Sequence, residues 1–234
     1  MFKRKLLFAV LVLLAAIVST SKMMGQDVVR NYDNKDFQNV SISNAIQCQI
    51  TQSDKYSIEI KADERDFKYL KVDQKGNAVK IFIDKNNYDA YGEIKVKITM
   101  PELTELNCSG ASKCKLSMNV PGKEFEANLS GSSYIEGSLT SGDIEINLSG
   151  SSKVNLNGKG SDLDLQASGS SSMKMKNFSL NNADVQMSGS SSAELNLNGK
   201  LNTKQSGSSK IVYYGNVDLG ETRFSGSSGI SKGE

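Results

Sequence analysis

Residues 141–152 read SGDIEINLSGSS, and the tetrapeptide that closes this stretch decides the fold. The same Ser-Gly-(Ser/Ala)-Ser sequence begins at seven serines in the second half of the chain: Ser109, Ser130, Ser149, Ser168, Ser188, Ser206 and Ser225. The intervals between these serines are 21, 19, 19, 20, 18 and 19 residues. A period this steady predicts one structural unit that is stacked repeatedly along the chain.

Apolar and polar residues alternate on both sides of each tetrapeptide. Ile144, Ile146 and Leu148 precede the copy at Ser149 at intervals of two residues, and Val154 continues the same alternation after it. This alternation predicts half-buried strands, and equivalent strands of successive repeats can stack in parallel as a solenoid. Glycine suits the corner between two strands because it reaches positive φ without steric cost. We therefore expect an all-β fold, a right-handed parallel β-helix (β-solenoid) with rungs of about 19 residues.

The region before the tetrapeptides also has a strand pattern. Alternation with period two runs from Phe37 to Met100, and turn sequences such as Ser53-Asp54-Lys55 interrupt it. We expect a signal peptide at 1–25, an N-terminal β region at 26–104 and the repeat solenoid at 105–234. The N-terminal β region should stack on the solenoid and form one continuous domain with it.

The N-terminus predicts export. Three basic residues, Lys3 to Lys5, precede an apolar run from Leu6 to Val18, which is too short to span a bilayer and is typical of a signal peptide. Cleavage could follow Ser21 or Gly25, and we favour Gly25. The mature chain would have no transmembrane segment and would reside in the periplasm, on the outer surface or outside the cell.

Composition excludes several classes of function. Removal of 1–25 takes away four basic residues and no acid, which leaves 24 basic against 26 acidic residues and a net charge of −2. This charge gives no footprint for nucleic acid. The chain has no histidine, which excludes Ser-His-Asp catalysis and the commonest zinc and copper sites.

Three cysteines form an odd set. Cys108 and Cys114 occupy apolar positions of the repeat, equivalent to Leu129 and Ile135 one rung later. The register favours buried free thiols for Cys48, Cys108 and Cys114, and a disulfide between Cys108 and Cys114 is the alternative.

Outward positions of the repeat form two columns. One column is acidic and contains Glu126, Glu145, Asp164 and Asp184. A solvated acidic face is the favoured interpretation, and the alternative is a calcium site made of these four carboxylates. The neighbouring column consists of Asn128, Asn147, Gln166, Gln186, Lys204 and Arg223. Its amides are expected to stabilise the stack through side-chain hydrogen bonds.

Two enzymatic interpretations can be weighed. Paired carboxylates could cleave a polysaccharide, as in a glycosidase or lyase built on a β-helix, but the chain lacks tryptophan and no aromatic cleft is evident. Ser112 to Lys115 and Ser171 to Lys174 match a Ser-x-x-Lys spacing without its companion motifs, so we interpret both as coincidence. We expect no catalytic residue and no cofactor, and a polysaccharide-active enzyme is the alternative.

Residues 141–152, with Gly142, Ile144 and Asn147 at their core, resemble the head GIN domain family of auto-transporter adhesins. Asp36-Phe37 and the segment from Lys97 to Leu103 are similar to the same family, so the resemblance covers about residues 35–234. It implies an exported β-helical domain of Bacteroidetes-type bacteria.

The function expected from these observations is non-enzymatic binding or adhesion in the cell envelope. The partner would be a glycan or a cell-envelope protein, and a purely structural envelope role is a further alternative. Self-association is also open, because the end of a solenoid exposes unpaired backbone.

Overall fold

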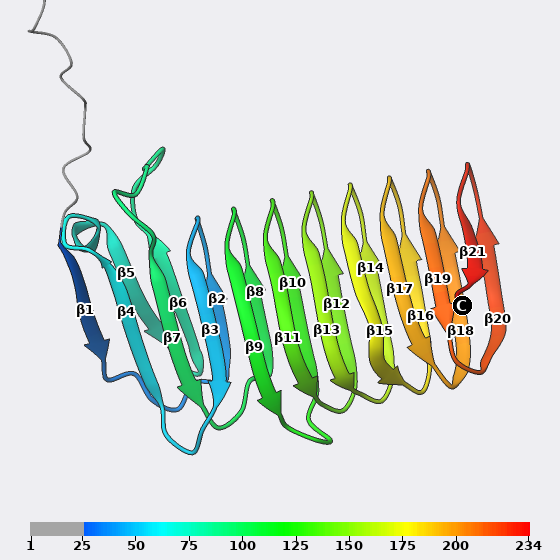
Figure 1. Ribbon diagram of the computed structural model, residues 1–234, viewed down its shortest axis with the longest axis horizontal. Helices are drawn as coiled ribbons and strands as arrows, with labels where there is room; N and C mark the ends of the chain where they lie inside the picture. The colour runs from blue at the N-terminus through cyan, green and yellow to red at the C-terminus, as the bar shows by residue number, and fades with distance from the viewer. Residues whose placement is uncertain (1–25) are drawn as a thin grey trace, which may run out of the picture.

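Two long β-sheets run side by side along the whole molecule (Figure 1). The computed structural model describes residues 26–234; the expected signal peptide and both of its cleavage positions lie outside them. One sheet has 11 strands and the other has 10, and successive coils lie about 19 residues apart in sequence. The prediction of an all-β fold built as a parallel β-solenoid is confirmed.

Each rung of the solenoid places one strand in each sheet, and a tight corner joins the two strands. The stacked strands pair in parallel with the equivalent strands of the next rung. The rungs are β2 (Asn39–Ile42) with β3 (Gln47–Gln52), β8 (Glu105–Cys108) with β9 (Lys113–Asn119), β10 (Phe125–Leu129) with β11 (Tyr134–Thr140), β12 (Ile144–Leu148) with β13 (Lys153–Lys159), β14 (Leu163–Ala167) with β15 (Ser172–Leu180), β16 (Ala183–Met187) with β17 (Ser192–Leu197), β18 (Gly199–Gln205) with β19 (Lys210–Tyr214), and β20 (Val217–Phe224) with β21 (Gly229–Lys232).

The Ser-Gly tetrapeptide makes the corner. Gly150 has a φ of 71°, and the amide of the next residue, Ser151, donates to the carbonyl of Gly131 in the preceding rung at 2.7 Å. The last serine of the tetrapeptide, Ser152, is buried and donates its hydroxyl to the carbonyl of Ser149 at 2.9 Å. The corners therefore form a column of their own, in which this corner-to-corner hydrogen bond repeats from rung to rung beside the other backbone bonds of the stack.

The first corner of this column has no tetrapeptide. Asn44, between β2 and β3, has a φ of 68°, and its carbonyl accepts from the amide of Ala111 at 2.8 Å. Asparagine is among the few residues other than glycine that adopt this conformation. The sequence pattern missed this corner because Ser43-Asn44-Ala45 lacks the glycine.

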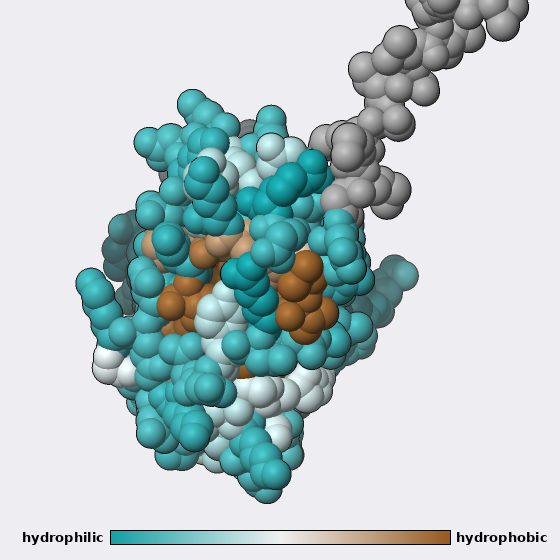
Figure 2. All heavy atoms as spheres, turned by 90° about the vertical axis from the view of Figure 1, so that its left-hand side faces the viewer, coloured by the Kyte–Doolittle hydropathy of each residue, from teal (hydrophilic) through white to brown (hydrophobic). Residues whose placement is uncertain are grey.

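Antiparallel strands cover the N-terminal end of the solenoid. Two of them, β1 and β4, extend the 11-stranded sheet from β7, and β5 pairs with β6 at the edge of the other sheet. The bounds are β1 (Asp27–Tyr32), β4 (Ser57–Asp63), the 3-10 helix η1 (Asp66–Lys68) and β5 (Leu70–Lys75). The strands to which they attach, β6 (Ala78–Ile83) and β7 (Lys95–Met100), pair in parallel with β2 and β3. Figure 2 shows this end as mostly hydrophilic, with a few apolar side chains between polar ones. The alternating pattern predicted the strands between 37 and 100 but neither β1 nor η1.

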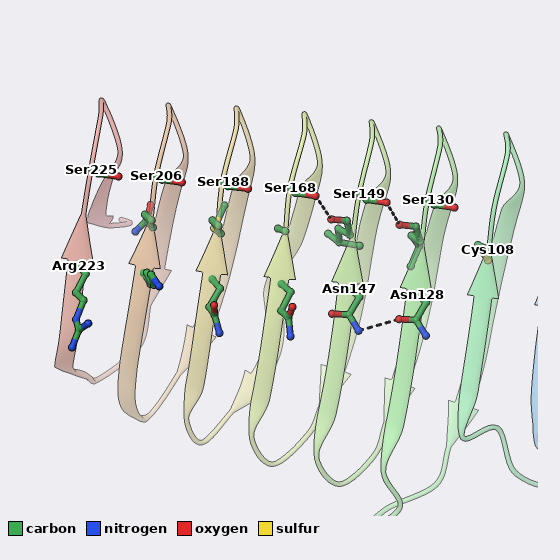
Figure 3. Close-up of a pocket in the computed structure, with 18 of the residues that line it drawn as sticks. Cys108, Asn128, Ser130, Asn147, Ser149, Ser168, Ser188, Ser206, Arg223 and Ser225 are labelled. Atoms are coloured by element: carbon green, nitrogen blue, oxygen red, sulfur yellow. Dashed lines mark hydrogen bonds between the residues drawn. The ribbon is translucent and has the colours of Figure 1, made fainter.

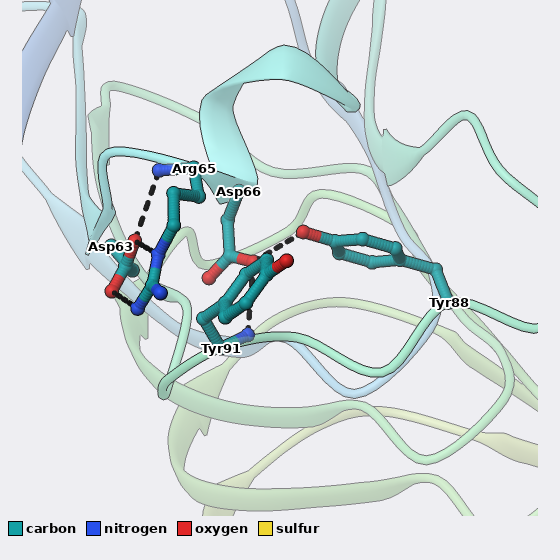
Figure 4. A network of polar contacts seen from close by, with 5 residues as sticks. All are labelled: Asp63, Arg65, Asp66, Tyr88 and Tyr91. Carbon is teal, nitrogen blue, oxygen red and sulfur yellow. Dashed lines mark hydrogen bonds and ion pairs between the residues drawn. The ribbon is translucent and has the colours of Figure 1, made fainter. Parts of the chain in front are cut away.

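A polar network ties the loop between β6 and β7 to this cap (Figure 4). The buried Asp66 accepts from the Tyr88 hydroxyl at 2.6 Å and from the Tyr91 amide at 3.0 Å. The Arg65 guanidinium lies 3.8 Å from the centre of the Tyr91 ring and donates two hydrogen bonds to Asp63. These bonds lower the pKa of Asp63 to about 2. The network fixes the only long loop that interrupts the rungs among residues 26–234.

The core changes character toward the C-terminal end. Through most rungs it is apolar, but at β18 the inward positions hold Thr203 and Gln205, which are both buried. With its side-chain amide turned so that donors meet acceptors, Gln205 donates to the carbonyls of Ser209 and Gly229 and accepts from the Thr203 hydroxyl, each at 3.2 Å. Beyond this polar layer, Phe224 is 46% exposed. The buried polar pair Thr203 and Gln205 thus interrupts the apolar core at this rung.

Candidate functional site

A groove of about 830 Å³ follows the outer face of the 10-stranded sheet, next to the corners (Figure 3). It runs across seven rungs, from β8 to β20. One side carries the amide column, which begins with Asn107 and continues through Asn128, Asn147, Gln166 and Gln186 to Lys204 and Arg223. The other side carries the first serine of each tetrapeptide, from Ser109 to Ser225.

Three asparagines of the amide column form a hydrogen-bonded ladder. Asn147 donates to the side-chain oxygen of Asn128 at 3.0 Å, and Asn128 donates to that of Asn107 at 3.0 Å. The predicted side-chain hydrogen bonding along this column is therefore confirmed for Asn128 and Asn147, and Asn107 extends it by one rung. The ladder stops at Gln166, since within the described chain the side chains of Gln166 and Gln186 make no hydrogen bond to a neighbouring rung. Their donors and acceptors face the groove and solvent.

Only some of the hydroxyls in the serine column donate hydrogen bonds to other groups of the protein. Ser149 and Ser168 donate their hydroxyls to the carbonyls of Leu129 and Leu148, at the long distances of 3.3 and 3.4 Å. Among residues 26–234, the hydroxyls of Ser130 and Ser188 donate to no protein group. The groove thus offers hydroxyls and amides in successive rungs about 4.8 Å apart, the spacing of neighbouring strands.

Charge changes along the groove. Its side chains are neutral from Asn107 to Gln186 and cationic in the last two rungs, at Lys204 and Arg223. Arg223 forms an exposed ion pair with Glu221 at 3.3 Å.

The sequence pattern predicted the amide column and the serine corners separately, but it did not predict that they line one groove. The spacing could have shown it, because Asn147 and Ser149 are two residues apart and point to the same face of a strand.

The acidic column lies on the same face of this sheet, at the far end of the strands. It lines a separate hollow of about 820 Å³ and pairs in register in the order predicted, Glu126, Glu145, Asp164 and Asp184, with Glu105 as a further member. Asparagines donate to most of these carboxylates: Asn128 to Glu126 at 2.6 Å and Asn202 to Asp184 at 2.7 Å are examples. Asp164 accepts no such bond within residues 26–234.

Asp164 is the member of the acidic column whose pKa is shifted by burial and by its neighbours. Burial, together with the carboxylates of Glu145 and Asp184 on the neighbouring strands, raises its pKa above the ordinary value of 3.8. Calcium binding by this column stays a prediction. Within 26–234, no three acidic or cysteine side chains are grouped so that they could hold a metal ion.

The substitution Asp164→Asn tests this interpretation of the column. We expect it to raise the free energy of unfolding at neutral pH by up to about 1 kcal/mol, because like charges on adjacent strands repel. The raised pKa means that the folded wild type binds this proton more tightly than the unfolded chain, so the wild type gains stability as pH falls through that pKa toward 3.8. The advantage of the variant in melting temperature should therefore shrink from neutral pH to about pH 4. A difference that does not vary with pH would contradict the assignment.

The Ser-x-x-Lys pairs are divided between the two faces of their strands. Ser112 and Ser171 point into the core and are buried, whereas Lys115 and Lys174 are exposed. A serine and a lysine placed in this way do not form a nucleophile and base.

Comparison with known families identifies the fold. The family model described as "Putative auto-transporter adhesin, head GIN domain" matches residues 36–217. The chain belongs to the head GIN domain family. No curated protein matches the sequence.

Solved structures share the architecture of this head GIN domain chain. A putative adhesin from Bacteroides fragilis superposes with a TM-score of 0.81 at 20% identity, covering 88% of this chain and 97% of its own. A putative adhesin from Parabacteroides merdae has a TM-score of 0.76 at 19% identity, covering 90% and 97%. A Parabacteroides distasonis protein named as a putative lipid binding protein has a TM-score of 0.71 at 21% identity, covering 90% and 98%. At these identities, the likeness shows the fold alone.

Membership in an adhesin family argues against an enzyme and is consistent with export. Within residues 26–234, no helix is long and apolar enough to cross a membrane.

Proposed function

We propose that this head GIN domain is a non-enzymatic binding protein of the cell envelope, and that the groove between the amide and serine columns holds an extended glycan chain. The observation that carries the proposal is the groove itself, which presents the same pair of polar groups in rung after rung. Six intervals between rungs of about 4.8 Å make it about 29 Å long. A linear polymer fits this shape better than a compact small molecule does.

The chemistry of the lining favours a hydroxyl-rich ligand. Amide side chains donate and accept, and serine hydroxyls do both, so each rung can pair with a sugar hydroxyl directly or through water. Gln166 and Gln186 are the most available, because the ladder of asparagines does not use them. The cationic end at Lys204 and Arg223 would place an acidic substituent of the chain there.

Binding without turnover is the expected behaviour. The acidic column lines a different hollow from the groove, and most of its carboxylates accept hydrogen bonds from asparagines, two of which, Asn128 and Asn147, also line the groove. The groove itself contains amides, hydroxyls and two cations but no carboxylate. It therefore has no acid-base pair of the kind that glycoside cleavage needs.

An array of linear polysaccharides tests the proposal. The tagged chain should bind at least one neutral or weakly acidic polysaccharide, and the double substitution Gln166→Ala/Gln186→Ala should weaken binding about tenfold or more, the equivalent of about 1.4 kcal/mol. The matched control is Gln49→Ala/Asn155→Ala, which removes two amides from the outer face of the other sheet. Failure of the wild type to bind any glycan, or equal binding by both double variants, would overturn the proposal. Binding of a protein partner to the groove, with no glycan bound, would support the alternative that this groove recognises a protein.

A further inference from the structure

The three cysteines lie close together inside the first rungs of the solenoid. Cys108, at the end of β8, and Cys114, in β9, flank one corner, and Cys48 in β3 pairs in register with Cys114. All three are buried free thiols. The Sγ atoms of Cys108 and Cys114 are 3.2 Å apart.

The geometry distinguishes two ways of pairing these thiols. Cys108 and Cys114 approach each other across the core within one rung, from strands that belong to opposite sheets. Cys48 and Cys114 are in-register neighbours on adjacent parallel strands, whose side chains point in the same direction. A disulfide needs an S–S distance of about 2.05 Å with its two Cβ atoms placed on either side of the bond, which facing side chains provide more readily.

We propose that Cys108 and Cys114 form a disulfide across the core when the chain folds in an oxidising compartment, and that Cys48 stays a thiol. The two thiols are oxidised and lose two hydrogens, and the oxidant is a disulfide, such as oxidised glutathione, which is reduced to two thiols. The bridge closes a ring of residues 108–114 around the first Ser-Gly corner. It would fasten the two sheets to each other next to the N-terminal cap.

Burial affects when the bond forms. A hydrogen bond with Cys114 and burial together raise the pKa of Cys108. The hydrogen bond with Cys108 lowers the pKa of Cys114, but contact with Cys48 and burial raise it more, so the net shift is upward. Exchange requires a thiolate, so the bridge forms while the rung is still open during folding.

Counting free thiols tests the proposal. The full chain is refolded with reduced and oxidised glutathione, unfolded in denaturant with iodoacetamide, and weighed by mass spectrometry. We expect one alkylated cysteine without a reductant and three after dithiothreitol, together with a melting temperature that is about 4–8 °C lower once the chain is reduced. Three alkylated cysteines without a reductant would overturn the proposal.

The pairing is tested separately. In the Cys48→Ala variant, neither remaining cysteine should be alkylated before reduction, and in Cys108→Ala both should be. Tryptic cleavage after Lys113 places Cys108 and Cys114 of the wild type on different peptides, so a non-reducing map detects the bridge as a linked pair even if a variant fails to fold. A linked pair that contains Cys48 would overturn the assignment.

Discussion

Substitution of Gly150 by alanine is expected to lower the free energy of unfolding by about 3–5 kcal/mol, the range of strain and overpacking in a closely packed site. Gly150 has a φ of 71°, which disfavours any residue with a Cβ. A Cβ at this position would also lie 2.6 Å from the carbonyl oxygen of Gly131 in the preceding corner. That carbonyl accepts the hydrogen bond that joins the two corners, so it cannot move without separating the rungs. Chemical denaturation followed by circular dichroism measures the loss.

The chain provides a matched control for this prediction. Gly122 has nearly the same φ, 74°, but no atom lies within 4 Å of the position its Cβ would take. Gly122→Ala should therefore cost only the conformational penalty of about 1–2 kcal/mol. Equal losses for the two variants would show that close stacking of the corners does not contribute.

Substitution of Phe125 by alanine is expected to cost about 3–5 kcal/mol, as for other phenylalanines removed from a packed core. Phe125 begins β10, is 1% exposed and pairs in register with Ile144 of the next rung. Its loss leaves a cavity between two sheets whose backbones are fixed by the ladders on both sides, so the site cannot collapse to fill it. The same denaturation experiment measures this effect.

Phe224 is the control for Phe125. It has the same side chain but lies in β20, beyond the polar layer of Thr203 and Gln205, and is 46% exposed. Phe224→Ala should cost about 1 kcal/mol or less. A comparable loss of unfolding free energy at both positions would mean that the apolar core continues past Gln205, contrary to the structure.

The repetitive part of the fold could be predicted from sequence because each rung repeats the same local constraints. Glycine at the corner and apolar residues at alternate positions specify strand, turn and strand, and they leave parallel stacking as the solution that buries the apolar face. The N-terminal cap was harder to predict. Strand β1 has mostly exposed residues and so shows no clear alternation, and the corner at Asn44 has asparagine, one of the few residues that can replace glycine there.

The candidate site was predictable in its parts but not in its assembly. The register of the columns, from Glu126 to Asp184 and from Asn128 to Gln186, follows from the repeat length alone. A hollow beside a column depends on how far the corner projects from the sheet and on where side chains turn. Alternation patterns do not contain that information. The division of the amide column into a bonded ladder and two unengaged glutamines likewise depends on side-chain length and conformation.

The central claim, that the groove binds a chain rung by rung, is tested most directly by calorimetric titration with size-separated oligosaccharides of a polysaccharide bound on the array. Affinity should rise with chain length until the oligosaccharide spans the groove of about 29 Å and should then level off. In Gln166→Ala/Gln186→Ala this rise should be much smaller. An affinity that is the same for the shortest and longest oligosaccharides, or a rise that the double substitution leaves unchanged, would contradict the claim.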